Sequence, residues 1–369
     1  MNLLLIKNNL KEGLNLLERV SGENASLPIL KNVLIETDDN KIKLSATNLE
    51  IATTCTISGK VLEAGKTTLP LNLLINLINN LQSERISLVE KNNSTQIQTD
   101  NYKATIQAVS AEEFPIIPKI KNTNQHLELN GGVLKESLGQ VLASAQTSDL
   151  RPELASVLWD YSLDNLKLVT TDSFRLSEKT IPGNQIKNTT KGTFRILIPF
   201  RTSQELYRIL KDEETVRVYH DPNQVLFETQ RFQMISRLIE GNFPDYSAIV
   251  PEKFETEVTI NRVELMNALK LAGVFSARVN EVRIKVSDKK TVEVFSTEQS
   301  VGENNYLLPA RVQGANRELS FNWRYLLDGL KSLATEDVFW GVNEESKPAL
   351  LKSPNDASYF YVLMPILKT

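Results

Sequence analysis

The sequence predicts an α+β protein with three similar domains in one chain. The first reason is an internal repeat, because similarity at a fixed period identifies repeated architectures that single motifs miss. The segment KLSATNLEIATT at 43–54 resembles KLVTTDSFRLSEKT at 167–180, and Asn48 lies 124 residues before Asp172. A weaker third copy, VEVFSTEQSVGENN, occupies 292–305. The chain therefore contains three successive copies of one sequence pattern, which are called the first, second and third pass below.

Proline-containing segments repeat at nearly the same interval. AEEFPIIP at 111–118 matches GNFPDYSAIVP at 241–251, and Phe114 lies 129 residues before Phe243. The segment YVLMP at 361–365 holds the equivalent place in the third pass. Two segments of any α+β protein can resemble each other by chance, but several features in the same order at similar offsets argue against coincidence. We expect domains at 1–124, 125–250 and 251–369.

Each third also contains two helical windows and several short strand segments. Leu10, Leu14 and Leu17 follow the i, i+4, i+7 spacing of an amphipathic helix. The first helices of the three passes are predicted over 8–20, 131–145 and 261–275, and the second helices over 70–82, 199–211 and 321–334. Segments that alternate or are rich in β-branched residues, bounded by turn residues, predict strands over 103–109, 214–220 and 281–287.

Composition narrows the class of protein. Of the 369 residues 41% are hydrophobic and 24% charged, with a formal net charge of -3, as is typical of a soluble globular protein of two or three domains. No segment approaches the roughly 18 to 20 apolar residues of a membrane helix, so we expect a cytoplasmic protein without membrane contact. Cys55 is the only cysteine, and His126 and His220 lie far apart. We therefore expect no disulfide, no metal site and no cofactor.

One segment suggests a different function. GKVLEAGKTT at 59–68 resembles the phosphate-binding loop G-x-x-x-x-G-K-[ST]. That loop has four residues between its glycines, whereas Gly59 and Gly65 enclose five, and Pro70 follows where a helix should present N–H groups. We expect a strand-connecting loop here. A nucleotide-dependent enzyme that uses this loop, with Lys66 on the phosphates, is the alternative hypothesis.

Hydrolytic chemistry has little support in the sequence. There is no G-x-S-x-G nucleophile motif. The paired carboxylates at 112–113 and 213–214 lie next to turn residues, where a solvated surface explains them. We find no catalytic set of residues and expect a protein that is not an enzyme.

The order of several segments resembles one known family. These segments are SLPILKNVLIE at 26–36, LSATNLEI at 44–51, EEFPIIP at 112–118, TTDSFRL at 170–176, EGNFPDYSAIVP at 240–251, FNWRYLLDGLKSL at 321–333 and YVLMPI at 361–366. Together they resemble the bacterial DNA polymerase III beta subunit, the DNA sliding clamp. The resemblance runs from end to end, and it implies the DNA clamp fold, with helices lining the inside of a ring and antiparallel sheets outside.

The resemblance also implies function and partners. Members of the family are processivity factors: two chains form a ring-shaped homodimer that encircles duplex DNA without reading its sequence. They tether DNA polymerase, the clamp loader and repair proteins, which insert short linear peptides into a pocket between the second and third domains.

Charge placement agrees with contact to DNA. The helical windows together carry a net charge of +6, which leaves -9 for the rest of the chain. The windows counted are 6–22, 70–82, 131–147, 199–211, 260–278 and 322–334. Such a division attracts phosphates to the helices, although Lys and Arg are also common on solvated helix faces. Helix 70–82 has no basic residue, so DNA contact in the first domain is expected to be weaker, carried by Asn72, Asn76, Asn79 and Asn80 or by nothing. The resemblance implies DNA-facing positions at Asn24, Ser148, Arg151, Arg201, Arg208, Lys211, Arg262, Lys270, Arg278, Arg324 and Lys331.

The peptide pocket is likewise carried over by position. Phe174, Ser173 and Ala248 depart from the residues that are common in the family, so peptide preference is expected to differ. A structural alternative is that the apolar segment 361–366 is only an edge strand buried by its own domain. The implied pocket residues are Leu154, Thr171, Ser173, Phe174, Arg175, Leu176, Pro244, Ala248, Ile249, Asn322, Tyr325, Ser346, Pro348, Val362, Leu363, Met364, Pro365 and Ile366.

The dimer interface is expected at two sheet edges. An exposed edge strand invites pairing with another chain, and the resemblance places segment 102–109 of one chain beside a strand within 298–308 of its partner. Segment 275–284 is shorter than the corresponding loop of many members, which implies a reduced interface there. The implied interface residues are Tyr102, Ala104, Ile106, Val279, Gln299 and Val301.

Overall fold

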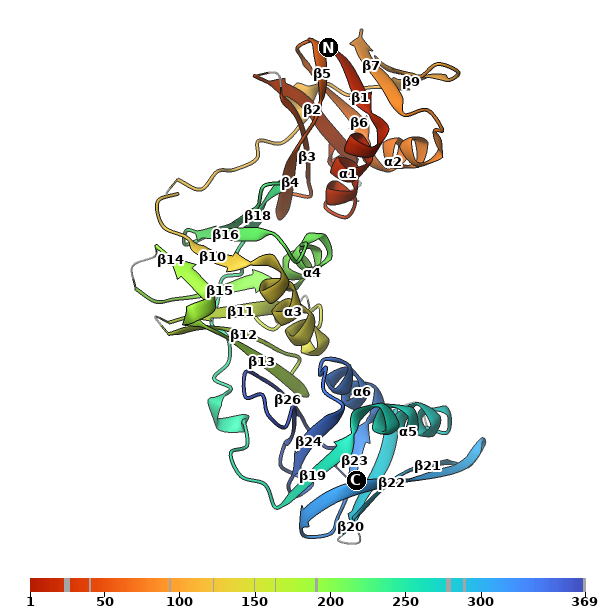
Figure 1. The fold of residues 1–369 in the computed structure, drawn as a ribbon, viewed down its shortest axis with the longest axis vertical. Helices are drawn as coiled ribbons and strands as arrows, with labels where there is room; N and C mark the ends of the chain where they lie inside the picture. Colours follow the sequence, from red (N-terminus) through yellow and green to blue (C-terminus); the bar gives the residue numbers. More distant parts are fainter. Residues whose placement is uncertain are drawn as a thin grey trace. The chain divides into compact units, whose positions relative to one another are not determined.

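The structure is a computed structural model that describes residues 1–22, 27–39, 41–92, 94–121, 123–148, 150–162, 164–189, 192–276, 280–287 and 290–367. These residues form α-helices and antiparallel strands (Figure 1), which confirms the predicted α+β class. The chain divides into two compact units, each of which is described by itself. Unit 1 comprises 1–132, 187–191 and 205–238, and unit 2 comprises 133–186, 192–204 and 239–369.

A helix forms in each of the six predicted windows. Leu10, Leu14 and Leu17 are buried on one face of the first helix, as their spacing predicts. In three helices an asparagine side chain caps the first turn. Asn130 Oδ1 accepts from the backbone N–H of Gly132, Asn261 Oδ1 from that of Glu264, and Asn322 Oδ1 from that of Arg324. The helices are α1 (Lys7–Leu17), α2 (Leu71–Asn80), α3 (Gly131–Val141), α4 (Phe200–Ile209), α5 (Arg262–Val274) and α6 (Trp323–Lys331).

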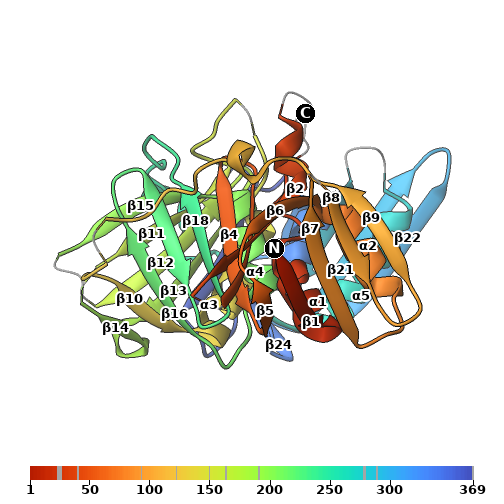
Figure 2. The same ribbon diagram turned by 90° about the horizontal axis from the view of Figure 1, so that it is seen from above.

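Unit 1 contains two antiparallel sheets. Helix α1 packs against α2 and against strand β4 of the larger sheet. The five-stranded sheet has the order β5 (Gly59–Glu63), β1 (Asn2–Ile6), β7 (Arg85–Lys91), β8 (Ser94–Gln98) and β9 (Lys103–Gln107), so β9 is an outer strand (Figure 2). The nine-stranded sheet has the order β14 (Ile186–Asn188), β10 (Leu127–Asn130), β16 (Thr215–His220), β17 (Gln224–Glu228), β18 (Phe232–Arg237), β4 (Ile51–Ile57), β3 (Lys41–Thr47), β2 (Asn32–Asp38) and β6 (Lys66–Pro70).

Unit 2 contains one twelve-stranded sheet. Helices α5 and α6 lie side by side on the strands of the third pass (Figure 1). The order is β15 (Phe194–Pro199), β11 (Ser156–Tyr161), β12 (Asn165–Thr171), β13 (Arg175–Pro182), β26 (Tyr359–Leu363), β25 (Ala349–Lys352), β24 (Asp337–Val342), β19 (Thr256–Asn261), β22 (Gly302–Gly314), β21 (Thr291–Glu298), β20 (Glu281–Ser287) and β23 (Arg317–Asn322).

The apolar segment 359–363 is an interior strand of this sheet. On one side β26 pairs with β13, with Arg175 opposite Leu363, and on the other it pairs with β25. Tyr361, Val362 and Leu363 are buried. The alternative that this segment is an edge strand of its own domain is therefore wrong, because β26 joins strands of the second pass to strands of the third. In unit 1, β18 and β4 join the second pass to the first in the same way.

The segment 59–68 does not form a phosphate-binding loop. Strands β5 and β6 occupy most of it, and only Ala64 and Gly65 lie between them. Lys66 lies in β6, and its Nζ is 3.9 Å from Glu112 Oε1. A phosphate-binding loop needs a run of free N–H groups that leads into a helix, so the enzyme hypothesis based on this segment loses its structural basis.

The predicted repeat is visible in the turn between β3 and β4. Thr47 Oγ1 donates to the carbonyl of Ile51 over 2.9 Å and accepts from the N–H of Leu49 over 3.0 Å. Asn48 Oδ1 accepts from the N–H groups of Glu50 and Ile51. Leu49 has a φ of 76°, an uncommon value for a residue with a side chain.

The turn between β12 and β13 has the same pattern of hydrogen bonds. Thr171 Oγ1 donates to the carbonyl of Arg175 over 2.8 Å and accepts from the N–H of Ser173 over 3.1 Å. Asp172 Oδ1 accepts from the N–H groups of Phe174 and Arg175, and Ser173 has a φ of 77°. The similarity of 43–54 to 167–180 thus reflects one turn, used twice.

Candidate functional site

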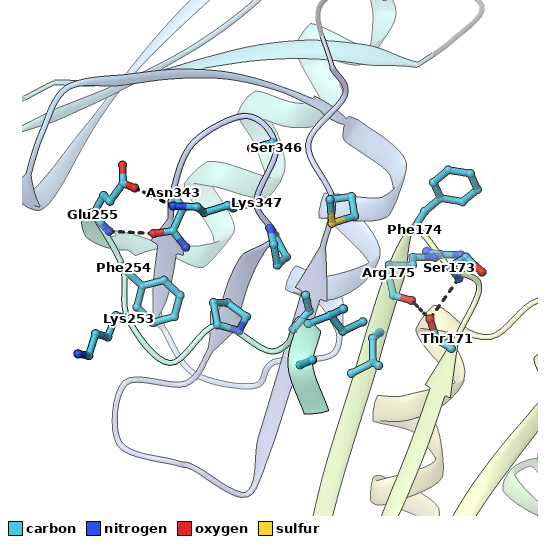
Figure 3. A pocket seen from close by; sticks show the side chains of 17 residues that line it. Thr171, Ser173, Phe174, Arg175, Lys253, Phe254, Glu255, Asn343, Ser346 and Lys347 are labelled. Atoms are coloured by element: carbon cyan, nitrogen blue, oxygen red, sulfur yellow. Dashed lines mark hydrogen bonds and ion pairs between the residues drawn. The ribbon is translucent and has the colours of Figure 1, made fainter. Parts of the chain in front are cut away.

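A cavity of about 680 Å³ lies in unit 2, between the β12–β13 turn and the loop that precedes β25. Figure 3 shows Phe174 and Arg175 on one side of it, and Phe254 and Asn343 on the other. The structure therefore brings together much of the set that the sequence predicted. The predicted residues that line the cavity are Thr171, Ser173, Phe174, Arg175, Leu176, Ala248, Ile249, Ser346, Pro348, Val362 and Met364.

The β12–β13 turn presents Phe174 at the cavity. The side chain is 60% exposed, although the backbone around it is fixed by the hydrogen bonds of Thr171 and Asp172. The N–H of Met364 donates to the carbonyl of Phe174 over 2.8 Å, so the residue after β26 is tied to the same turn. Met364 is 37% exposed. Two large apolar side chains thus stand open to solvent on a rigid support.

Arg175 connects the turn to helix α6. Its Nε lies 2.9 Å from Asp172 Oδ2, its NH1 lies 2.9 Å from Asp328 Oδ2, and its guanidinium lies 4.2 Å from the centre of the Tyr325 ring. Burial opposes the charge, but Tyr361 and the two carboxylates outweigh it, so the pKa of Arg175 is raised. Arg175 is therefore a permanently charged part of the cavity wall.

The linker after β18 forms another wall. Residues Ser247–Ile249 form a single 3-10 turn, which is fixed at its start by Asp245 Oδ1 accepting from the N–H and hydroxyl of Ser247. Ala248 and Ile249 of this turn line the cavity, and Ile249 is 48% exposed. The linker therefore supplies apolar side chains to the cavity lining.

The far end of the cavity was not predicted from the sequence. The N–H of Glu255 donates to Asn343 Oδ1 over 3.0 Å, and Lys347 Nζ lies 3.4 Å from Glu255 Oε1. Glu255 also pairs with Arg317, and these cations hold its pKa below the usual range. These residues come from irregular segments that carry no repeat or periodic signal. The additional lining residues are Pro251, Lys253, Phe254, Glu255, Asn343 and Lys347.

Seven predicted pocket residues lie outside the cavity lining. Leu363 is buried within β26, Asn322 caps α6, and Tyr325 lies beneath the Arg175 guanidinium. Leu363 and Tyr325 thus adjoin the lining residues Val362 and Arg175, and Asn322 starts the helix that carries Tyr325. The full set outside the lining is Leu154, Pro244, Asn322, Tyr325, Leu363, Pro365 and Ile366.

The predicted DNA-facing cations differ in their surroundings. Arg201, Lys211 and Lys270 are exposed, and no described acidic side chain pairs with them. Arg208, in contrast, is bound by Glu205 Oε2 at 2.8 Å and donates to the carbonyl of Asn15. We infer that the three unpaired cations are more available to an anionic ligand than Arg208.

The remaining predicted cations within the described residues also have protein partners. Arg262 donates to the carbonyl of Thr335, which follows α6. Arg324 Nε donates to Asn280 Oδ1 over 3.0 Å, and its guanidinium lies over the Trp323 ring. Lys331 lies 3.5 Å from Asp328, Arg151 lies 3.1 Å from Glu153, and Ser148 Oγ accepts from the N–H of Arg151. Asn24 and Arg278 lie outside the described residues.

Two exposed cations, one in helix α1 and one in the segment after it, were not predicted from the sequence as candidates for DNA contact. Lys11 and Arg19 lie on the exposed face, and both are in a window whose positive charge was noted without naming them. All four predicted asparagines of α2 are exposed, and the helix carries no charge; they are Asn72, Asn76, Asn79 and Asn80.

The two predicted interface edges both carry exposed side chains. Tyr102 beside β9 is 41% exposed, although Ile106 within β9 is buried. In β22 the residues from 302 to 309 pair with β21, whereas the residues from 310 to 314 pair with β19. Val301 and Leu307 are 58% and 64% exposed. Val279 lies outside the described residues, and so does part of the short segment 275–284.

Other candidate chemistry is sparse in the described residues. They contain no cluster of three or more His, Cys, Asp or Glu side chains that could hold a metal ion. Burial raises the pKa of Cys55 to about 12, so its thiol is unreactive at neutral pH. Nowhere among the described ranges is a helix both long and apolar enough to cross a membrane.

Comparison with known proteins identifies the family. Residues 1–118 match the family model of the DNA polymerase III beta subunit N-terminal domain, residues 128–245 match its central domain, and residues 247–367 match its C-terminal domain. The chain belongs to the DNA polymerase III beta subunit family. The three similar domains predicted from the repeat are thus confirmed.

Relatives and solved structures agree over the whole length. The Beta sliding clamp of Synechococcus elongatus is 26% identical over 99% of both chains. The crystal structure of the DNA polymerase III beta chain from Streptococcus pneumoniae superposes with a TM-score of 0.93 at 26% identity, covering 100% of both chains. The sliding clamp of Bacillus subtilis superposes with a TM-score of 0.93 at 22% identity over the same coverage. The fold of this chain is therefore that of the sliding clamps.

Proposed function

We propose that this chain is a DNA sliding clamp, a processivity factor that encircles duplex DNA as a ring-shaped homodimer. The observation that carries the proposal is the match of all three passes to successive domains of one family. We place the domain boundaries near 124 and 250: the first two matches leave residues 119–127 between them, and the second and third matches meet at residue 246. The protein acts as an accessory subunit in the cytoplasm, without catalytic residues or a cofactor of its own.

The 680 Å³ cavity is the proposed binding site for short linear peptides of DNA polymerase, the clamp loader and repair proteins. Exposed Phe174, Ile249 and Met364 offer apolar contacts for anchor side chains. Methionine adapts its shape to different partners, and a few apolar anchors supply most of the affinity of such interfaces. Arg175 and Asn343 at the wall provide polar contacts that fix the orientation of the peptide.

DNA is held without base recognition in this proposal. Phosphate contacts position a protein on the duplex without reading sequence, which suits sliding. We assign these contacts first to Arg201, Lys211 and Lys270, whose side chains are exposed and unpaired among the described residues. The cations that have protein partners contribute less, and the asparagines of α2 contribute polar contacts without charge.

The ring closes by pairing of β9 from one chain with the 302–309 part of β22 from the other. Both segments have one side that pairs within the chain, β9 with β8 and the β22 segment with β21. Such half-paired strands are suited to pairing with another chain. Because the two edges differ, the contact is head-to-tail and closes after two subunits.

Retention on DNA of different topology tests the proposal. The chain is loaded by its clamp loader onto a nicked circular plasmid and onto the same plasmid cut once, and bound protein is measured after gel filtration. An encircling clamp stays on the circle and slides off the linear form. Equal retention on both forms would contradict encirclement. Saturable ATP binding that is lost in Lys66→Ala would instead support the enzyme hypothesis.

A further inference from the structure

Tyr246 anchors the linker wall of the cavity to the sheet. Its hydroxyl donates to Glu178 Oε2 over 2.6 Å, and its ring meets that of Phe243 edge-on at a centroid distance of 6.2 Å. The N–H of Ile249 donates to the Tyr246 carbonyl over 3.1 Å. Tyr246 therefore holds the chain to the sheet two residues before Ala248. Ala248 and Ile249 are the residues of the following turn that line the cavity.

Glu178 is an unusual residue for its position. It is only 5% exposed, and it lies two residues from Leu176 on β13, so both side chains point to the same face of the sheet. Leu176 belongs to the apolar cluster on that face, and Tyr246 packs against this cluster. The second oxygen of Glu178 lies 3.0 Å from Lys167 Nζ. Both oxygens of this buried carboxylate are thus paired, as its burial requires.

The tyrosine is suited to act as a permanent donor. Burial and the hydrogen bond to Glu178 raise its pKa, so the phenol keeps its proton at any physiological pH. The hydrogen bond joins a neutral donor to a charged acceptor, and such bonds are stronger than neutral ones.

The first junction of the chain folds without this hydrogen bond. By the repeat offsets, Ile117 corresponds to Tyr246 and Thr54 corresponds to Glu178. Ile117 and Thr54 both line a different cavity in unit 1, and Thr54 Oγ1 lies 3.0 Å from Ser45 Oγ. Isoleucine cannot donate to a carboxylate, and β4 still pairs with β18 as β13 pairs with β26. The strand pairing of a junction therefore does not require the tyrosine–glutamate pair.

We propose that the Tyr246–Glu178 hydrogen bond is a latch that holds the Ser247–Ile249 turn in the position that binds peptide. This inference rests on the proposed function of the cavity. Tyr246 is a positioning residue, because it acts through Ala248 and Ile249 and is absent from the cavity lining. Without the latch the turn samples other positions, and peptide affinity falls by the fraction of time that the wall is displaced.

Peptide affinity in Tyr246→Phe tests the latch. The probe is a fluorescein-labelled synthetic peptide copied from the clamp-contacting segment of the replicative polymerase, and Kd is measured by fluorescence polarisation. We expect Kd to rise about three- to tenfold, which corresponds to a wall that is correctly placed about 10% to 30% of the time. The matched control is Tyr219→Phe, because Tyr219 Oη donates to Glu228 Oε2 over 3.1 Å in unit 1. The control is expected to bind as the wild type does.

Variants of the acceptor separate positioning from general stability. Glu178→Gln keeps an oxygen acceptor for Tyr246, whereas Glu178→Met removes it. We expect the glutamine variant to bind within about twofold of the wild type and the methionine variant to bind as weakly as Tyr246→Phe. The Tyr246→Phe, Glu178→Met double variant should be no weaker than either alone, since both remove one interaction. Thermal unfolding is recorded for all variants.

The outcomes are distinct. Wild-type affinity in folded Tyr246→Phe overturns the latch and leaves the peptide site intact. The latch is also overturned if the affinities of Glu178→Gln and Glu178→Met follow the thermal midpoints of these variants and do not depend on whether residue 178 offers an oxygen acceptor. If the wild type does not bind the peptide and Phe174→Ala changes nothing, the proposed peptide site fails, and the latch fails with it.

Discussion

Replacing Phe174 by alanine should weaken peptide binding strongly while leaving the fold almost unchanged. Phe174 is 60% exposed, and its backbone is held by Asp172 and Met364 independently of its ring. A phenylalanine side chain carries about 200 Å² of surface, so about 120 Å² remains for a peptide to cover. At about 25 cal/mol per Å² this burial contributes about 3 kcal/mol, which corresponds to a loss of about a hundredfold in affinity.

The assay compares peptide Kd, dimer mass and thermal unfolding on the same preparation. Leu62→Ala is the matched control, because Leu62 is a 55% exposed apolar residue on β5 of unit 1 and does not line the cavity. We expect Phe174→Ala alone to lose affinity and both variants to keep the thermal midpoint of the wild type. If a stable Phe174→Ala chain binds the peptide with wild-type affinity, this prediction is wrong, because the peptide would then not cover the exposed Phe174 ring.

Three further outcomes follow from the described geometry. Arg201→Ala combined with Lys270→Ala should reduce the slope of log K against log salt by about 1.8 for duplex DNA, because both side chains are exposed and unpaired among the described residues. A shift in sequence preference would instead mean that these side chains read bases. Val301→Asp, at a residue that is 58% exposed beside β22, should give monomers in sedimentation equilibrium at micromolar concentration, and an unchanged dimer would exclude this edge. Burial lowers the pKa of His220 in the folded chain, so below about pH 6.5 the unfolded chain binds more protons than the folded chain. The free energy of unfolding should therefore fall as the pH drops from about 6.5 to the pKa of folded His220. Urea titrations in which His220→Gln keeps the pH dependence of the wild type would contradict this.

The features of the structure that could be predicted are those whose sequences repeat along the chain or have a helical period. Five of the six described α-helices lie within their predicted windows and α1 begins one residue earlier, because spacings such as that of Leu10, Leu14 and Leu17 leave one face apolar. The turn around Asp172 was found because the turn around Asn48 uses the same hydrogen bonds. Repetition thus located one half of the cavity.

The rest depends on contacts that no linear pattern records. Lys253, Phe254 and Asn343 reach the cavity from irregular segments, where side chains are placed by packing and not by periodicity. Charge counts also treat every cation alike, whereas Glu205 engages Arg208 and leaves Arg201 free. Both are arginines of the same helix, α4, so a count of charges gives them equal weight and only their neighbours in the structure distinguish them.

The pairing of β13 with β26 has a consequence for synthesis of the chain. Strand β26 is translated after every other strand of the twelve-stranded sheet, yet it covers β13 of the second pass. Until β26 emerges from the ribosome, β13 presents an unpaired edge from Arg175 to Lys179 that another nascent chain could pair with. Closing this contact also requires a long loop, which slows folding. Protection of the β13 amides in pulsed hydrogen exchange should therefore appear late, at the same time as protection of β26.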